Sequence, residues 1–285
     1  MKLIDGKLVS EKIKEELKEK IVKNHLHPGL AIILANHDPA SEIYVRNKIK
    51  ACEKIGIHAE LYQFQENNTE EEIIECIQKL NEDANIHGII VQSPVAPQFH
   101  EDVITRYIDP KKDVDGFGVM SLGYLASNQT KFLSATPYGI IKLLEYEQIA
   151  INGAHVVIVG RSKIVGRPLA LALLNRDATV TIAHSKTKNL KEITRQADIL
   201  VVAIGKAKFI TDEYIKDGAV IVDVGINRIE GKLYGDVDSD AVSKKALYLT
   251  PVPGGVGPMT IAMLLSNVVD SALRKREENY NGFKN

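Results

Sequence analysis

Four polar side chains in the first half of the chain have types and spacings that could support catalysis. Tyr44 and Lys48 stand four residues apart in a stretch with helical periodicity, so they share one face of a helix. Gln92 follows a short apolar run, and open α/β sheets bind ligands where such strands end. Asp115 lies in an Asp-Val-Asp-Gly loop. This pattern alone does not choose a reaction, because a surface pair on a helix and an Asp-Gly turn are also ordinary structural features.

A turn in the second half of the chain could hold a phosphate group. It runs from Gly160 to Pro168, between an apolar strand and the start of a helix. Free backbone N–H groups and the helix dipole favour an anion at such a position. The spacing differs from G-x-G-x-x-G, so the turn indicates a dinucleotide site mainly through its strand–turn–helix setting.

The charges around this turn favour NADP over NAD. An NAD site usually has an acidic residue after the second strand, where it binds the ribose hydroxyls. Here that strand is followed by His184-Ser185-Lys186, which contains no acid. The guanidinium of Arg161 could bind a 2′-phosphate through two parallel hydrogen bonds. The alternative is that Arg161 and Lys186 are solvated surface charges.

A second loop, TPVPGGVGPMT from Thr250 to Thr260, contains three glycines and three prolines. Such a stretch cannot form the interior of a helix. It can form a rigid loop whose backbone approaches a flat ligand closely, and we interpret it as a binding loop.

The elements that must position these residues alternate between helix and strand, which predicts α/β architecture with parallel sheets. Continuous apolar runs predict strands at 29–34, 59–64, 87–91, 155–159, 178–183, 198–204 and 219–224. Helical patterns are expected at 41–55, 69–80, 137–148, 168–175, 190–196 and from 258 past 273.

Capping signals refine these boundaries. Ser10 fits the N-cap of a first helix, and Thr69 with Glu72 forms a capping box. Pro137 after Thr136 is typical of a helix start. Residues 92–136 are rich in proline and glycine, and we expect a linker or functional loop there.

The composition excludes several classes of protein. The chain has 285 residues, 45% of them apolar, which suggests two globular domains and excludes a disordered chain. A net charge of -1 argues against a strongly basic nucleic-acid-binding protein. Cys52 and Cys76 are expected to be free thiols in a reducing compartment. Neither a signal sequence nor a membrane-length apolar run is apparent, so we expect a cytoplasmic protein or the mature form of an organellar one.

Seven segments together resemble the bifunctional methylenetetrahydrofolate dehydrogenase/cyclohydrolase family of the FolD type. They occur in the order found in that family and cover nearly the whole chain. The segments are PASEIYVRNKIKACEKIGI from Pro39, HGIIVQSP from His87, KKDVDGF from Lys111, GRSKIVGRP from Gly160, TRQADILVVAIGK from Thr194, VDVGIN from Val222 and TPVPGGVGPMT from Thr250.

The resemblance implies two successive reactions. NADP+ oxidises 5,10-methylenetetrahydrofolate to the methenyl cation, and water then converts that cation to 10-formyltetrahydrofolate. Lys48 would be the main catalytic group and Gln92 would orient it, while Tyr44 would stack on the folate rings and Asp115 would bind the pterin. The further substrate-binding positions implied are Val91, Ser93, Pro253, Gly254, Gly255, Val256 and Gly257. Those implied for NADP are Gly160, Arg161, Ser162, Ser185 and Ile226. No metal is implied.

The resemblance and the pattern together predict two α/β domains joined by two long helices, with the active cleft between them. Residues 1–138 and 258–285 would form a catalytic, folate-binding domain with a returning C-terminal helix. Residues 139–257 would form a Rossmann-like NADP-binding domain. A homodimer paired through the cofactor domain is implied, with no nucleic-acid or membrane partner.

Two departures from the family lie near the expected pocket. The usual Gln-Leu-Pro-Leu-Pro is Gln92-Ser93-Pro94-Val95-Ala96, and the usual Pro-Cys-Thr-Pro is Ser134-Ala135-Thr136-Pro137. Replacing a leucine that faced folate by serine would remove about 1.5–3 kcal/mol of apolar contact. Two alternatives therefore remain open: a family member with only one of the two activities, and a non-catalytic module that binds NADP or folate.

Overall fold

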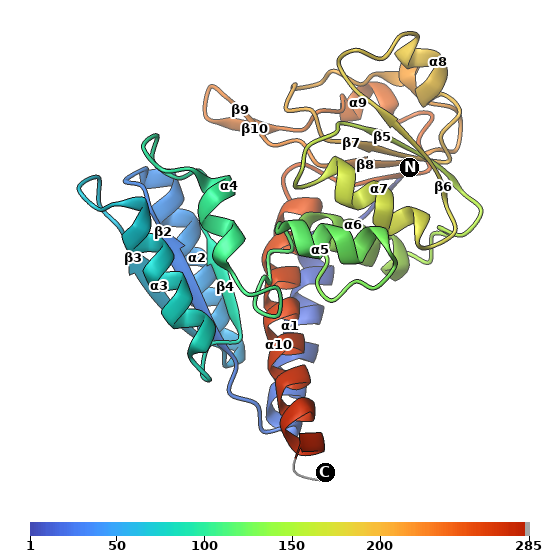
Figure 1. Ribbon diagram of the computed structural model, residues 1–285. Coiled ribbons are helices and arrows are strands. Elements are labelled where there is room, and N and C mark those ends of the chain that lie inside the picture. The colour runs from blue at the N-terminus through green and yellow to red at the C-terminus, as the bar shows by residue number, and fades with distance from the viewer. Residues whose placement is uncertain (283–285) are drawn as a thin grey trace. The chain divides into compact units, whose positions relative to one another are not determined.

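The computed structural model describes residues 1–282, which fall into two compact units (Figure 1). The C-terminal unit comprises Met1–Lys12 and Ser134–Met263. The N-terminal unit comprises Ile13–Leu133 and the chain from Leu264 onward. Both units are α/β structures built on parallel sheets, as the sequence predicts.

The N-terminal unit is built on a three-stranded sheet in the order β3-β2-β4. All neighbours are parallel: β2 (Gly29–Leu34) pairs with β3 (His58–Gln63) on one side and with β4 (Gly88–Val91) on the other. Every residue of β2 and β4 is buried, which explains their continuous apolar runs. Gln92 follows β4 directly, so the end of this edge strand sets its position.

Two long helices of this unit begin at side-chain caps. Helix α2 (Pro39–Ile55) begins after Asp38, whose carboxylate accepts hydrogen bonds from two main-chain N–H groups, and ends at Gly56 in the left-handed conformation. Helix α3 (Glu70–Glu82) begins at Thr69, and both hydrogen bonds of the predicted capping box with Glu72 are present. The caps at Asp38 and Gly56 fix the ends of α2, which carries Tyr44 and Lys48.

Residues 92–136 contain more helix than the sequence predicts. They include α4 (Glu101–Ile104), a short 3₁₀ helix (Thr105–Tyr107) and α5 (Val119–Ala126). The prediction of linker or loop is therefore incomplete. These helices are too short to show a clear period, and glycines flank or interrupt α5.

The C-terminal unit contains a six-stranded sheet in the order β1-β11-β8-β7-β5-β6, with every neighbouring pair parallel. Its strands are β1 (Lys2–Leu3), β5 (His155–Val159), β6 (Thr179–Ala183), β7 (Ile199–Val202), β8 (Val220–Asp223) and β11 (Tyr248–Leu249). From β5 the chain passes to β6 on one side and then to β7 on the other. This reversal is the switch point at which Rossmann-like sheets bind ligands.

Short helices and a hairpin complete this unit. The helices are α6 (Ala135–Tyr146), α7 (Gly166–Leu174), α8 (Leu190–Thr194), α9 (Ser239–Val242) and a 3₁₀ turn (Asp212–Tyr214). Strands β9 (Asn227–Ile229) and β10 (Lys232–Tyr234) form a separate antiparallel hairpin.

The predicted starts of several helices are wrong, and α2 and α7 each begin two residues before the predicted residue. Helix α1 (Gly6–Lys23) begins before Ser10, because Asp5 Oδ1 accepts a hydrogen bond from the N–H of Leu8 at 2.9 Å. Ser10 instead lies inside the helix and donates back to the carbonyl of Lys7. Helix α6 begins at Ala135, so Thr136 lies in its first turn rather than at its cap. Each true start lies upstream of the residue with the stronger capping signal.

The first twelve residues cluster with the C-terminal unit, although we predict them in the N-terminal domain. The reason is β1, which pairs with β11 at the edge of the six-stranded sheet. A two-residue strand leaves no recognisable pattern in the sequence. The functions assigned to the two domains stay predictions at this point.

Helix α10 (Val256–Gly282) belongs to both units. It is helical through the polar stretch that begins at Arg274, and Phe283–Asn285 lie outside the described residues. Its stretch Val256–Glu278 is long and apolar enough to span a membrane by length and composition, but most of it is buried inside the protein. Polar residues such as Asn267 and Asp270 divide the apolar run, so the sequence does not reveal a segment of this length.

Candidate active site and cofactor pocket

Lys48 and Gln92 meet in the N-terminal unit. Lys48 Nζ, from α2, donates a hydrogen bond of 3.0 Å to Gln92 Oε1 at the end of β4. Gln92 Nε2 donates to the carbonyl of Ser93 at 2.7 Å, which fixes the orientation of the amide with its oxygen toward the lysine. Gln92 is buried, whereas Lys48 is partly exposed. The pair therefore presents a held ammonium group with two further N–H donors available to a ligand.

The two aspartates of the Asp-Val-Asp-Gly loop have different structural roles. Asp113 is buried and accepts hydrogen bonds from the N–H groups of Gly116 and Gly118 and from the hydroxyl of Ser121. It holds the loop together. Burial raises the pKa of Asp115 to about 6, while the nearby positive charge of Lys48 acts to lower it. Asp115 is thus the carboxylate of this loop that lies within electrostatic range of Lys48.

Tyr44 lies one turn before Lys48 on α2 and exposes 57% of its surface. A ring so exposed beside a held lysine is available to stack on a planar ligand. Val91, by contrast, is buried in the apolar core of this unit. Its side chain belongs to the core, so a ligand would meet only its main chain.

Ser93 is exposed, and its hydroxyl donates to Glu101 Oε2 at 2.9 Å. The apolar contact that a leucine would supply at this position is replaced by a polar pair. The charge of Glu101 also contributes to the raised pKa of Asp115. The departure from the family pattern therefore leaves the Lys48–Gln92 bond in place and gives residue 93 a polar contact with Glu101.

The glycine turn of the C-terminal unit is shaped by close backbone approaches. Gly160 follows β5 with φ +132°, and a Cβ there would lie 2.3 Å from the main-chain oxygen of Ala203. A Cβ on Gly166 would lie 2.2 Å from the main-chain oxygen of Gly160. Ser162 Oγ accepts from the N–H groups of Val165 at 3.1 Å and Gly166 at 3.4 Å, where α7 begins. Neither glycine tolerates a side chain, which supports the interpretation of this turn as a ligand cradle.

A pocket of about 270 Å³ opens beside this turn at the switch point of the sheet. Gly160, Arg161 and Ser185 line it, as does Lys206, and no carboxylate does. The donor set fits the phosphate groups of a dinucleotide, because cationic side chains and a hydroxyl surround a glycine cradle. Ser162, which is also predicted to bind the cofactor, lies in the turn itself and is not among the residues that line the pocket.

Ile226 lies elsewhere, in a pocket of about 140 Å³ lined by the loop from Pro251 to Pro258. It is 57% exposed. The substrate-binding residues predicted in that loop, Pro253, Gly254, Gly255, Val256 and Gly257, line the same pocket. The structure thus groups Ile226 with the glycine–proline loop rather than with Arg161.

Two buried aspartates that were not predicted from the sequence, Asp223 and Asp236, hold the loops that line both pockets. Asp223 accepts from the N–H groups of Gly225, Asp236 and Val237, and burial raises its pKa to about 6. Asp236 accepts from three successive N–H groups between Ile204 and Lys206. These bonds join the ends of β7 and β8 to the segment before α9. Polar residues that directly follow buried apolar strands are a signal that could have found Asp223, whereas Asp236 has no such marker.

Comparison with known proteins shows the family of the chain. A family model for the tetrahydrofolate dehydrogenase/cyclohydrolase catalytic domain matches residues 4–115. A model for the NAD(P)-binding domain of the same family matches residues 134–276. The chain belongs to the tetrahydrofolate dehydrogenase/cyclohydrolase family. Among the residues that the structure describes, no group of three or more His, Cys, Asp or Glu side chains is arranged to hold a metal ion.

Members of this family match the chain over almost its full length. The bifunctional protein FolD of Agathobacter rectalis is 53% identical over 95% of this chain and 99% of its own length. The crystal structure of FolD from Campylobacter jejuni has a TM-score of 0.94 and 49% identity, covering 96% of this chain and 99% of that one. The Trypanosoma brucei enzyme, solved with NADP cofactor and an inhibitor, has a TM-score of 0.89 and 35% identity, covering 95% and 97%. The family and the Rossmann-like fold expected from the sequence are confirmed.

Proposed function

We propose that the chain is a bifunctional NADP-dependent methylenetetrahydrofolate dehydrogenase and methenyltetrahydrofolate cyclohydrolase. The observation that carries this proposal is the hydrogen bond from Lys48 to Gln92 within electrostatic range of Asp115. Family membership supports both activities, since the close relatives are named as bifunctional enzymes.

The dehydrogenase step converts 5,10-methylenetetrahydrofolate to the 5,10-methenyl cation. NADP+, when bound, accepts the hydride. The chain's part is to bind and orient: the Gly160 cradle leaves room for phosphate oxygens, and Arg161 and Ser185 supply donors for the 2′-phosphate. Hydride transfer needs alignment more than acid–base chemistry, so these binding groups determine its rate.

The N-terminal unit supplies the groups that hold the folate. The Asp115 carboxylate accepts from the amino and ring N–H groups of the pterin, which is a donor-rich edge. The exposed ring of Tyr44 stacks on the flat part of the substrate. Burial raises the pKa of Asp115, but at pH 7 the group is still mostly ionised and able to accept both hydrogen bonds.

The cyclohydrolase step adds water to the methenyl carbon and opens the ring to 10-formyltetrahydrofolate with release of one proton. Lys48 is the side chain placed to assist. Its Nζ is held by Gln92 while its other hydrogen-bonding positions stay open to water and substrate. A positioned group of this kind contributes by proton transfer and by orienting the attacking water.

The test is a coupled assay of the purified full chain with 5,10-methylenetetrahydrofolate and NADP+, following NADPH and the methenyl intermediate by absorbance. Formation of NADPH with little methenyl accumulation is expected. Persistent methenyl cation would instead identify a dehydrogenase alone and would implicate the Ser93–Glu101 pair. Absence of NADPH with either NADP+ or NAD+, in protein that binds the cofactor, would refute the dehydrogenase. Adding the methenyl compound directly then measures the cyclohydrolase by itself.

We also propose a cytoplasmic homodimer. Family resemblance supports this assembly, and apolar side chains are exposed on the edge strand and a neighbouring helix of the C-terminal unit. Ile182 on β6 is 39% exposed and Leu174 at the end of α7 is 57% exposed. Light scattering of the purified chain distinguishes a dimer from a monomer, and a monomer at working concentration would contradict the proposal.

A further inference from the structure

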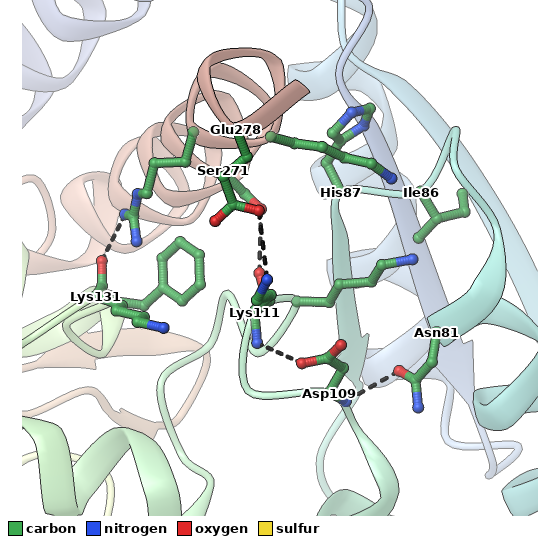
Figure 2. Close-up of a pocket in the computed structure, with 12 residues that line it drawn as sticks. Asn81, Ile86, His87, Asp109, Lys111, Lys131, Ser271 and Glu278 are labelled. Atoms are coloured by element: carbon green, nitrogen blue, oxygen red, sulfur yellow. Dashed lines mark hydrogen bonds and ion pairs between the residues drawn. The ribbon is translucent and has the colours of Figure 1, made fainter. Parts of the chain in front are cut away.

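A pocket of about 250 Å³ lies in the N-terminal unit, away from the Lys48 group. Figure 2 shows its walls: helix α10 contributes Ser271 and Glu278, and the segment before β4 contributes Ile86 and His87. Gln92 follows β4, whereas His87 precedes it, so the pocket and the catalytic group lie at opposite ends of this strand. No role proposed above uses this pocket.

The pocket carries a strong excess of positive charge. Its lining contains five basic residues, Lys111, Lys112, Lys131, Arg274 and Lys275, and two acidic residues, Asp109 and Glu278. This concentration of charge affects neighbouring groups. Burial and the charge of Lys275 lower the pKa of both Lys112 and His87. A folded protein gains no stability from such crowding of like charges, which is more typical of a ligand site.

Two of these ammonium groups have neutral partners. Lys112, which is buried, donates to the carbonyls of Leu80 at 2.7 Å and Asp83 at 2.8 Å. Lys275 Nζ donates to the carbonyl of Ala84 at 2.9 Å. Among the side chains of residues 1–278, which the structure describes, neither forms a salt bridge with a carboxylate. Carbonyls orient an ammonium group without neutralising it, so the positive potential of the pocket is retained.

Phe132 and Arg274, which also line the pocket, indicate which kind of anion could bind. Phe132 is buried, and the guanidinium of Arg274 lies 4.4 Å from its ring centre while donating to the carbonyl of Lys131. That guanidinium is therefore engaged rather than set as a free fork for a planar carboxylate. Lysine ammonium groups act as point charges and suit a compact, charge-dense anion.

We propose that this pocket is a binding site for a small phosphate-type polyanion, separate from the folate and dinucleotide sites. Lys111 and Lys275 are the cations placed to contact the anion: Lys111 is exposed and pairs with Glu278 at 3.3 Å, and Lys275 is partly exposed. An anion that binds there offsets the positive charge that remains in the lining after Asp109 and Glu278 are taken into account.

Calorimetry with pyrophosphate tests this site on the full chain saturated with NADP+, so that phosphate sites of the dinucleotide pocket are filled. One pyrophosphate per chain is expected, with affinity that falls as salt rises. The variant with both Lys111→Gln and Lys275→Gln should bind about tenfold more weakly. Lys54→Gln is the matched control, because Lys54 is exposed on the same unit outside the pocket, and it should bind as the wild type does.

Three results would overturn the proposal: no heat of binding to the NADP+-saturated chain at millimolar pyrophosphate, equal affinity in the double variant, or binding that occurs only in chain free of NADP+. The variants are first compared with the wild type by thermal unfolding, because Lys275 also bonds to Ala84. If the double variant is unstable, Lys111→Gln alone serves, since its exposed side chain can be changed without disturbing the core. Unaltered affinity in that single variant would then count against the site.

Discussion

The N-terminal unit presents its chemistry through side chains, whereas the C-terminal unit presents it through backbone. Lys48 and Gln92 meet by a single hydrogen bond between side chains from a helix and a strand end. At the glycine turn, by contrast, the main-chain conformation that we interpret as a ligand cradle is possible because Gly160 and Gly166 have no side chains. The two regions should therefore fail in different ways. In the N-terminal unit, isosteric substitutions should abolish catalysis and leave the fold intact. At the glycine turn of the C-terminal unit, substitutions that add a side chain should weaken both cofactor binding and stability.

The sharpest test of the first region is Lys48→Met, which keeps the length and apolar stem of the side chain and removes the ammonium. Cyclohydrolase activity should fall by about 10²–10⁴-fold, the usual contribution of a positioned proton-transfer group. Thermal stability should change little, because Lys48 is partly exposed on α2. Lys54→Met, near the end of the same helix, is the control and should retain full activity. A Lys48→Met enzyme that hydrolyses the methenyl compound at the wild-type rate would contradict the proposed role.

The corresponding test of the second region is Gly160→Ala. The added Cβ would meet the oxygen of Ala203 at 2.3 Å in a backbone conformation that alanine rarely adopts. Strain of about 1–3 kcal/mol should lower stability and weaken NADP binding by about 10–100-fold. Both quantities can be measured by thermal unfolding with and without NADP.

Gly123→Ala is the matched control for that change, because a Cβ at Gly123 meets no atom within 4 Å. Gly123 lies in α5, where alanine is the better helix former, so this variant should be as stable as the wild type or slightly more stable. If Gly160→Ala behaved like Gly123→Ala, the close approach at the turn would have no functional importance.

Arg161→Ala separates charge recognition from shape in the cofactor pocket. The substitution removes the guanidinium that we assign to the 2′-phosphate and leaves the glycine cradle unchanged. The KM for NADP+ should rise about tenfold, while that for NAD+ should hardly change, because NAD+ has no 2′-phosphate. Equal losses with the two cofactors would place Arg161 outside the 2′-phosphate site.

The smallest effect expected is on pH dependence. Asp115 has a raised pKa of about 6, so lowering the pH through 6 protonates it and removes a charged acceptor for the pterin. The KM for 5,10-methylenetetrahydrofolate should be about fourfold higher at pH 5.5 than at pH 8. In Asp115→Asn the KM should be high at both pH values, and this dependence should disappear. A wild-type KM that is constant over this range would argue against Asp115 as the pterin acceptor.

The sequence predicts those parts of the fold that rest on local patterns. Strands β2 and β5 occupy the predicted residues because a strand buried on both faces needs a continuous apolar run. The capping box at Thr69 is present because its hydrogen bonds involve residues only three positions apart. The errors occur where distant residues decide the outcome. Strand β1 exists only because β11 offers it an edge, and no local signal records that pairing.

The candidate site shows the same division. Helical spacing places Tyr44 beside Lys48, and the end of a predicted strand locates Gln92. Their meeting and the separate roles of Asp113 and Asp115 depend on tertiary contacts, so family resemblance rather than spacing suggested them. Asp236 could not be recognised at all, because the three N–H groups that it holds lie some thirty residues earlier in the chain. Whether the predicted substrate and cofactor residues bind their ligands stays a prediction.

Helix α10 has a consequence for how the protein is made. The N-terminal unit includes the chain from Leu264 onward, and Asn267 donates hydrogen bonds to the carbonyls of Val114 and Leu133 while Lys20 pairs with Asp270 at 2.6 Å. During synthesis on the ribosome, the N-terminal unit therefore cannot complete its fold until the residues from Leu264 onward have emerged. The N-terminal unit, most of which is translated before the C-terminal unit, is completed last, and a ribosome that stalls within α10 leaves it without the hydrogen bonds of Asn267 and the ion pair of Asp270.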